Sequence, residues 1–274
     1  MAGVFAFLAA AMVARAAPLH ESVMHVPVVK DGRAENIEVT VFKPDGSGPF
    51  PIVVLSHGSP RSAEDRRAEG RLRLVAQSEP FVQLGFAVLV PTRRGYGDSE
   101  GEWAEGYGSC ASPDYYSAGL ETARDVRSVV DAVRHEAWAD PRHVVLVGQS
   151  AGGFGSVAAS SLPFEGLVGV VNFAGGRGSL APGRVCGESR LVEAMERYGR
   201  AARVPELWIY SANDHFFDPT LARRMYEAFV RSGGAAEFVE APSVGLDGHG
   251  YFARAMQDWA PRVAAFLRRV GVVR

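Results

Sequence analysis

The sequence has no strong excess of charge of either sign. Its 29 lysine and arginine residues stand against 31 aspartate and glutamate residues, a formal net charge of -2 over 274 residues. Nucleic-acid binding requires a concentrated basic surface. The arginine pairs at 66–67, 93–94, 223–224 and 268–269 are scattered and interleaved with acids, so we interpret them as solvated faces or capping charges. The sequence therefore predicts no nucleic-acid partner.

Long apolar runs are also missing after the first few residues. No later segment reaches the roughly 18 apolar residues that a membrane helix needs, so we expect no integral membrane segment in the mature chain. Val4 to Val13 is apolar and leads into Ala14-Arg15-Ala16-Ala17-Pro18. This order is typical of a signal peptide, although no Lys or Arg precedes the apolar run. We interpret residues 1–17 as a signal peptide of an exported protein, either periplasmic or secreted; the alternatives are a misassigned start codon and a frayed apolar helix.

Cysteine is scarce, with Cys110 and Cys186 alone in the sequence. Neither has a second Cys or a His at the spacing of zinc ligands, so the sequence predicts no metal site. Both cysteines stand in loop-forming segments rather than in apolar runs. In an exported protein, two loop cysteines favour a bridge, and we predict a Cys110–Cys186 disulfide.

The residues that are present indicate one large α/β domain, residues 18–274. Short, wholly apolar strands are typical of a parallel sheet buried on both faces. Strands are predicted at 52–56, 86–90, 144–147, 167–173, 206–211 and 236–240, and an edge hairpin at 24–30 and 37–43. Helices are predicted at 61–84, with Pro80 as a break or new start and Val75 in the core, and at 113–136, 188–199, 220–232 and 252–270. We expect a mostly parallel doubly wound sheet flanked by helices, with a small insertion up to about residue 203 instead of a large lid.

The segment from Val144 to Gly153 contains Gly148-Gln149-Ser150-Ala151-Gly152 directly after an apolar strand and before a small-residue helix. This order is typical of a nucleophile elbow, in which a sharp turn exposes the serine hydroxyl. The backbone N–H of Ala151 opens the helix and is predicted to stabilise an oxyanion. Ser59 follows His57-Gly58 at the end of an earlier strand, and its N–H is the predicted second donor.

An acid and a base for Ser150 follow later in the chain. Asp214 and His249 each stand in a loop after a predicted strand, which gives the order serine, acid, histidine. We predict that Ser150 attacks an acyl carbon, His249 accepts its proton and Asp214 orients the imidazole. We predict other roles for the rival residues: His57 orders its own loop, Asp98 is structural, His215 is a pocket-wall or packing residue, Asp218 caps a helix and Asp247 contacts His249 from outside. The aromatic residues Trp103, Tyr107, Phe216 and Phe217 are candidates for the wall of a substrate pocket.

These motifs, together with Arg94-Gly95-Tyr96-Gly97-Asp98-Ser99, resemble those of the α/β-hydrolase superfamily. More narrowly, the chain resembles dienelactone hydrolase-like and prolyl-oligopeptidase-like serine carboxylesterases, from about residue 23 to the C-terminus. The resemblance implies the same triad. We predict that the reaction requires no cofactor. Two positions depart from it: dienelactone hydrolase itself uses a cysteine where this chain has Ser150, and Gln149 stands where many relatives have His.

The sequence thus predicts a serine hydrolase that cleaves a small-molecule carboxylic ester through an acyl-enzyme intermediate. A peptidase or amidase with the same triad is the main alternative, although no propeller or other gating domain precedes the catalytic part. The third hypothesis is a non-catalytic binding protein that has the same fold and retains the nucleophile elbow. The sequence leaves the ester and the oligomeric state undetermined.

Overall fold

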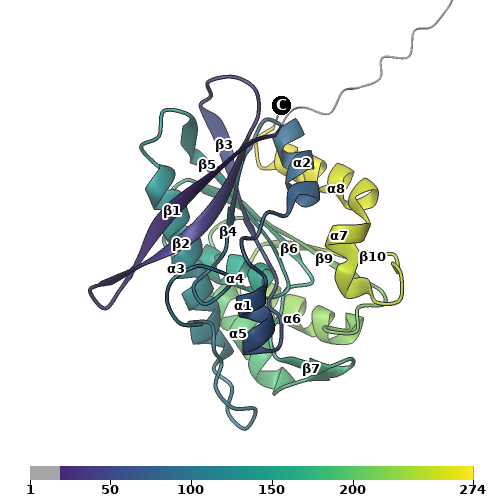
Figure 1. Cartoon of the computed structure of the whole chain (residues 1–274). Helices are drawn as coiled ribbons and strands as arrows, with labels where there is room; N and C mark the ends of the chain where they lie inside the picture. Colours follow the sequence, from purple (N-terminus) through teal and green to yellow (C-terminus); the bar gives the residue numbers. More distant parts are fainter. Residues whose placement is uncertain (1–18, 274) are drawn as a thin grey trace, which may run out of the picture.

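The computed structural model describes residues 19–273 (Figure 1). The signal-peptide interpretation of residues 1–17 falls outside this range. Within it, a central sheet of eight strands has the order β1-β2-β4-β3-β5-β6-β9-β10. Strands β1 and β2 pair antiparallel and β2 joins β4 antiparallel, whereas all remaining neighbours are parallel. The bounds are β1 His20–Lys30, β2 Arg33–Lys43, β3 Phe50–Ser56, β4 Ala87–Pro91, β5 Ala139–Gln149, β6 Leu167–Phe173, β9 Glu206–Ser211 and β10 Ala236–Ala241. The predicted mostly parallel sheet and its edge hairpin are confirmed.

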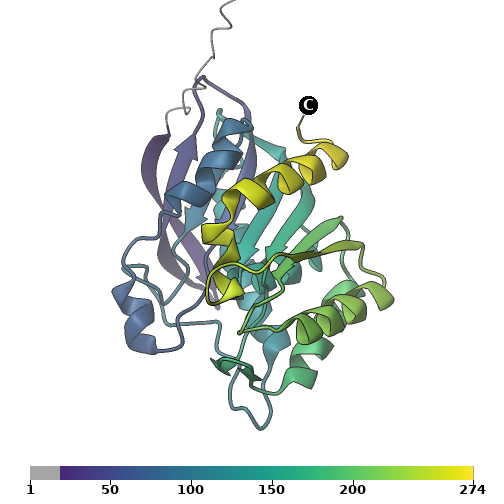
Figure 2. The ribbon, with the colours of Figure 1, turned by 90° about the vertical axis from the view of Figure 1, so that its right-hand side faces the viewer.

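Helices cover both faces of the sheet. Helices α3 Tyr115–Val133, α4 Ala151–Ser160, α5 Glu188–Gly199 and α6 Pro219–Arg231 contribute to one apolar core. Helices α2 Val75–Gln83, α7 Tyr251–Arg254 and α8 Met256–Arg269 contribute to a second core on the other face, where Figure 2 shows α2 beside α8. Along β5, Val144 and Leu146 belong to the first core while Val145 and Val147 belong to the second. Since successive strand residues point to opposite faces, burial on both faces explains the continuous apolar run.

Three local expectations were wrong. Segment 61–84 forms two helices, α1 Ala63–Ala68 and α2, and the break lies between them, where Gly70 and Leu74 have φ angles of 59° and 45°; Pro80 lies inside α2. The helix is therefore broken by left-handed backbone at these two residues and not by the proline. Val75, which is 37% exposed, lies outside the core. The last helix is interrupted at Ala255. The insertion contains an unexpected two-stranded sheet, β7 Ser179–Ala181 and β8 Arg184–Val185.

Glu206, at the start of β9, is a buried carboxyl without a cationic partner in residues 19–273. Burial raises the pKa of Glu206 to about 8, although Ser160 and Trp208 contact its oxygens at 2.6 Å each. The Ser160 hydroxyl is within donating distance of both Glu206 Oε1 and the Val157 carbonyl, the latter at 2.8 Å, and Trp208 Nε1 donates to Glu206 Oε2. A neutral group at this position is therefore fully hydrogen-bonded, whereas a carboxylate is buried with its charge uncompensated.

We expect Glu206→Gln to stabilise the protein in a pH-dependent way. Because the folded-state pKa of Glu206 is raised from 4.5 to about 8, the carboxyl costs stability increasingly as the pH rises between these values. The amide mimics the protonated acid, so the variant should gain about 4 kcal/mol of unfolding free energy at pH 8 and little at pH 4.5. Urea unfolding at both pH values measures the gain. Glu237→Gln, on the exposed strand β10, is the control; equal gains for Glu206→Gln at both pH values would contradict the assignment.

Candidate active site

Ser150 occupies the turn between β5 and α4 in a rare backbone conformation, with φ 54° and ψ −120°. Such a conformation costs roughly 1–3 kcal/mol in a residue with a side chain and persists where its surroundings fix it. Here the Ser150 N–H donates to the Phe173 carbonyl at 2.9 Å, and the Ser150 carbonyl accepts from Gly176 at 3.1 Å. Hydrogen bonds to the segment at the end of β6 thus fix the backbone conformation of the turn.

The two glycines of the turn are required by close packing. A Cβ on Gly148 would lie 2.4 Å from the carbonyl carbon of Gly152, and a Cβ on Gly152 would lie 2.3 Å from the Ser56 carbonyl oxygen. Strand β5, helix α4 and the end of β3 therefore meet at distances that no side chain fits. The sequence motif predicted this crowding, and the geometry is that of a nucleophile elbow.

The end of β3 supplies the neighbour of Ser150 on one side. A Cβ on Gly58 would lie 3.4 Å from Ser150 Cβ, so the loop after β3 packs directly against the serine. The next residue, Ser59, and the first residue of α4, Ala151, line the same cavity as Ser150. Neither backbone N–H has a hydrogen-bond acceptor within residues 19–273, and the Ala151 N–H has none because it opens the helix. Two free N–H donors thus accompany the serine.

Asp214 and His249 come together at the carboxyl ends of β9 and β10. The Oδ2 atom of Asp214 lies 3.1 Å from Nδ1 of His249, and the Asp214 side chain is completely buried. The other carboxylate oxygen, Oδ1, accepts from the backbone N–H groups of Phe216 at 2.7 Å and Phe217 at 3.0 Å. Because both oxygens are used, Asp214 is fixed with one oxygen toward the imidazole.

Three further contacts hold His249. Gln149, next to the serine, donates from Nε2 to the His249 carbonyl at 2.7 Å. Phe216 stacks on the imidazole with ring centroids 4.0 Å apart and an interplanar angle of 6°. Asp247 Oδ1 accepts from the His249 N–H at 2.9 Å and from the His215 N–H at 3.1 Å. Gln149, whose role the sequence left open, therefore joins the serine turn to the histidine loop.

The remaining rival residues lie apart from this constellation. Asp218 caps α6 by accepting from Thr220 and Leu221 N–H groups. His57 is buried; burial and the Arg93 guanidinium lower the pKa of its imidazole well below the ordinary value. His57 Nδ1 donates to the Gly58 carbonyl at 2.6 Å and Nε2 accepts from the Arg93 N–H, so both nitrogens are engaged within its own surroundings. His215 is exposed and does not line the cavity, contrary to the expectation for a pocket-wall residue.

The cavity beside Ser150 has a volume of about 230 Å³. It contains all four aromatic residues proposed from the sequence, together with polar residues from the loop after β3 and from the insertion. Its lining includes Trp103, Tyr107, Phe216, Phe217, Arg61, Arg66, Arg177, Ser179 and Leu180. The insertion thus forms one wall of the cavity, and the loop between β4 and α3 forms another.

The interpretation of the arginine pair 93–94 as solvated charges was wrong. Arg93 and Arg94 are 0% and 1% exposed. Arg93 pairs with Glu105 and donates from Nη1 to the His57 carbonyl at 2.8 Å, while Arg94 Nε donates to Asp125 Oδ1 at 2.6 Å. Burial opposes ionisation of Glu105, but Arg177 and Arg93 outweigh it and hold the pKa of this carboxyl well below its ordinary value.

Glu105 and Asp125 are the supporting residues that the sequence analysis missed. Asp125 occupies a position in α3 between the core residues Ala123 and Val126. An acid on the apolar face of a helix requires a buried cation, and this signal could have pointed to Arg94. Glu105 offered no comparable signal, because it stands in an irregular loop.

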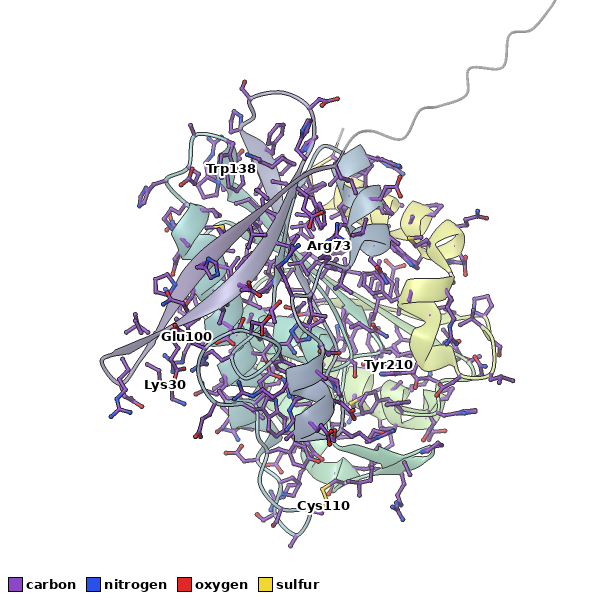
Figure 3. The ribbon with its side chains drawn as sticks, viewed as in Figure 1. Lys30, Arg73, Glu100, Cys110, Trp138 and Tyr210 are labelled. Atoms are coloured by element: carbon purple, nitrogen blue, oxygen red, sulfur yellow. A yellow bond between two sulfur atoms is a disulfide. The ribbon has the colours of Figure 1, made fainter. Side chains whose placement is uncertain are left out.

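The predicted disulfide between Cys110 and Cys186 is present, with Cα atoms 5.2 Å apart (Figure 3). It joins the loop that carries Trp103 and Tyr107 to the insertion that carries Ser179 and Leu180. These two segments form opposite parts of the cavity lining, so the bridge ties the walls together.

We expect the double variant Cys110→Ala/Cys186→Ala to lose about 4 kcal/mol of unfolding free energy, since the bridge closes a loop of 76 residues. Its KM should rise more than its kcat falls, because the bridged segments line the cavity rather than hold the serine. Denaturant unfolding and steady-state kinetics measure the two effects. Mass mapping of the unreduced protein should find the linked peptides; two thiols that alkylate without reduction would reject the bridge.

Among residues 19–273, no cluster of three or more His, Cys, Asp or Glu side chains is arranged to hold a metal ion. No helix in the same range is long and apolar enough to cross a membrane.

A serine turn of this geometry on a mostly parallel sheet, with an acid and a histidine after later strands, defines the α/β-hydrolase superfamily. Comparison with known families makes the assignment narrower. The model of the X-Pro dipeptidyl-peptidase (S15) family matches residues 31–198, so the chain belongs to this family.

The individual relatives are named for different activities. The quorum-quenching protein AidA of Acinetobacter baumannii is 29% identical over 132 residues, which are 48% of this chain and 38% of AidA. A puromycin-hydrolyzing peptidase of Mycobacterium tuberculosis has a TM-score of 0.62 and 18% identity, covering 96% of this chain and 42% of the peptidase. The Pyrococcus furiosus esterase Pf2001 has a TM-score of 0.62 and 18% identity over 92% of this chain and 94% of the esterase. This chain thus spans less than half of AidA and of the peptidase, and the structural likenesses establish the shared fold.

Proposed function

We propose that this protein is a serine hydrolase that cleaves small carboxylic esters through an acyl-enzyme intermediate. The observation that carries the proposal is the 3.1 Å contact between Asp214 and His249 at the sheet edge where Ser150 lines the cavity. Gln149 connects the serine turn to the His249 backbone, which supports the assignment of this histidine as the base. The buried Asp214 accepts a hydrogen bond from the Nδ1–H of His249, which keeps this proton on Nδ1 and leaves Nε2 as the basic nitrogen.

The mechanism begins with proton transfer from Ser150 Oγ to His249 Nε2 as the serine attacks the ester carbonyl. The backbone N–H groups of Ser59 and Ala151 stabilise the negative charge on the carbonyl oxygen. His249 then protonates the leaving alcohol, and an acyl group remains on Ser150. Water, activated by the same histidine, attacks the acyl-enzyme and releases the acid.

An ester substrate is favoured over a peptide by the cavity. Its volume of about 230 Å³ suits a small acyl group, and its lining contains no Asp or Glu to bind the ammonium of an N-terminal dipeptide. The likeness to esterase Pf2001 over nearly its whole length adds support.

Hydrolysis of short-chain p-nitrophenyl esters, compared with p-nitroanilides of the same acyl groups, tests this proposal. We expect the esters to be cleaved with a much higher kcat/KM than the anilides. Equal cleavage of both would show a peptidase or amidase, and no turnover of either would favour a binding protein.

A further inference from the structure

Three arginines and no carboxylate line the cavity beside Ser150. Arg61 and Arg66 come from the segment after β3, and Arg177 comes from the segment after β6. None of the other lining residues is an aspartate or a glutamate. The whole protein has a net charge of -2, whereas the charged side chains that line the cavity are all positive. The positive charge is therefore a local feature of the site and does not follow from the overall composition.

Arg66 is 6% exposed and has no carboxylate within ion-pair distance in residues 19–273. Its guanidinium lies over the Trp103 ring at 3.8 Å, and Nη1 donates to the carbonyls of Pro60 at 3.2 Å and Arg61 at 3.1 Å. These contacts fix the orientation of the guanidinium but leave its charge uncompensated. The Nε and Nη2 atoms make no hydrogen bond within the described residues.

Arg61 is held in a similar way, by Ser179 and Phe216 of the cavity lining. Its Nε donates to the Ser179 carbonyl at 2.8 Å and its Nη2 to Ser179 Oγ at 3.1 Å. Its guanidinium lies over the Phe216 ring at 4.3 Å, while the opposite partner of Phe216 is the imidazole of His249. No carboxylate of residues 19–273 pairs with Arg61, so a second positive charge stands beside the catalytic constellation.

Arg177 adds to the same field from a buried position. Its Nη2 donates to Glu105 Oε2 at 2.8 Å, but Glu105 also pairs with Arg93. One carboxylate therefore serves two guanidinium groups, and the cluster keeps a net positive charge. The Nε atom of Arg177 is buried and has no hydrogen-bond partner in the described part of the chain. Burying a cation in this way is costly unless an anion compensates it.

We propose that this cavity binds a carboxylate group of the substrate, so that the protein hydrolyses esters that carry a free carboxylate in the acyl part. The proposal rests on the proposed esterase function and names its substrate class. Arg61 and Arg66 bind the carboxylate through N–H groups oriented by Phe216 and Trp103, while the ester carbonyl lies at Ser150. Arg177, from its buried position in the cavity lining, adds to the positive electrostatic potential at the bound carboxylate. A substrate with a free ammonium in this position, such as the N-terminus of a peptide, is repelled.

Three length-matched p-nitrophenyl esters test the charge preference: the adipate monoester, the heptanoate and the 6-aminohexanoate. With spontaneous hydrolysis subtracted, the adipate monoester should exceed the heptanoate in kcat/KM by about 10- to 100-fold, because charge-assisted hydrogen bonds are formed to the anion. The 6-aminohexanoate should be the poorest substrate. The preference for adipate should fall as the salt concentration rises.

Arg66→Gln and Arg61→Gln should each lower the ratio of adipate to heptanoate hydrolysis about tenfold, mainly through KM. The ratio is measured within one variant, so partial loss of folded protein does not change it. Arg67→Gln removes an exposed charge from the same helix, α1, outside the cavity lining, and should leave the ratio unchanged. If Arg66→Gln fails to fold, Arg61→Gln tests the proposal by itself, because Arg61 is exposed.

The failure of this inference is distinct from failure of the proposed function. If the wild-type protein hydrolyses the heptanoate as well as the adipate monoester, or prefers the 6-aminohexanoate, the carboxylate site is wrong while the esterase function stands. If it hydrolyses none of the three esters, the esterase function itself is contradicted.

Discussion

Ser150→Ala is expected to lower kcat for ester hydrolysis by about 10⁴- to 10⁶-fold, the largest effect of any single substitution considered for this chain. The alanine keeps the Cβ and the backbone of the turn, so the packing of Gly148 against Gly152 is unchanged. Only the nucleophilic oxygen is removed. Residual activity in the variant would come from the oxyanion donors Ser59 and Ala151, which bind the carbonyl but form no acyl-enzyme.

The matched control is Ser161→Ala, at the end of the helix that Ser150 begins. Ser161 Oγ donates to the Ala158 carbonyl within α4 and contacts no residue of the constellation. Its removal should leave kcat and KM unchanged. Burst kinetics with p-nitrophenyl acetate should show one equivalent of p-nitrophenol in the wild type and none in Ser150→Ala. Full activity of Ser150→Ala would refute the nucleophile assignment.

Asp214→Asn is expected to lower kcat by about 10⁴-fold while the fold is retained. The reason lies in the two N–H groups of Phe216 and Phe217, which donate to Asp214 Oδ1. In the variant these donors orient the amide so that its oxygen accepts from them and its NH₂ group faces His249. Since Nδ1 must then accept a hydrogen bond, the proton moves to Nε2, and the imidazole cannot take the proton from Ser150.

Two acids nearby distinguish this tautomer effect from a general loss of negative charge. Asp218→Asn removes the negative charge at the N-terminus of α6 but keeps a capping oxygen, so it should reduce stability by less than about 1 kcal/mol without reducing kcat. Asp247→Asn retains an acceptor for the His249 N–H and should have a small kinetic effect. Steady-state kinetics and thermal unfolding of the three variants measure these differences. A greater loss of kcat in Asp218→Asn or Asp247→Asn than in Asp214→Asn would transfer the acid role.

The linear sequence carried the information for the sheet and the elbow because both depend on local patterns. Five apolar residues in succession specify a strand buried on both faces, and Gly148 and Gly152 specify the crowded turn around Ser150. The chain order of Asp214 and His249 followed from loops placed after strands, since the carboxyl ends of parallel strands lie at one edge of the sheet. Pro80 misled, because a proline tolerated inside α2 looks the same in sequence as one that ends a helix.

The charged environment of the site was decided by contacts between distant segments. In the sequence Arg93 and Arg94 resemble surface charges, but in the structure both are buried and form ion pairs with Glu105 and Asp125. Gln149 reaches the backbone of His249, 100 residues later in the chain. Such contacts depend on how the loops pack on the sheet, and neither hydrophobic periodicity nor a sequence motif predicts them.

The sequence by itself therefore determined the fold class, the serine turn and the residues that stand with it at one edge of the sheet. Only the tertiary structure decided that Arg61, Arg66 and Arg177 line one cavity with Ser150. The physical reason is that hydrophobic periodicity and turn chemistry are local properties, whereas the net charge of a cavity depends on which side chains from separate segments find a carboxylate partner and which do not.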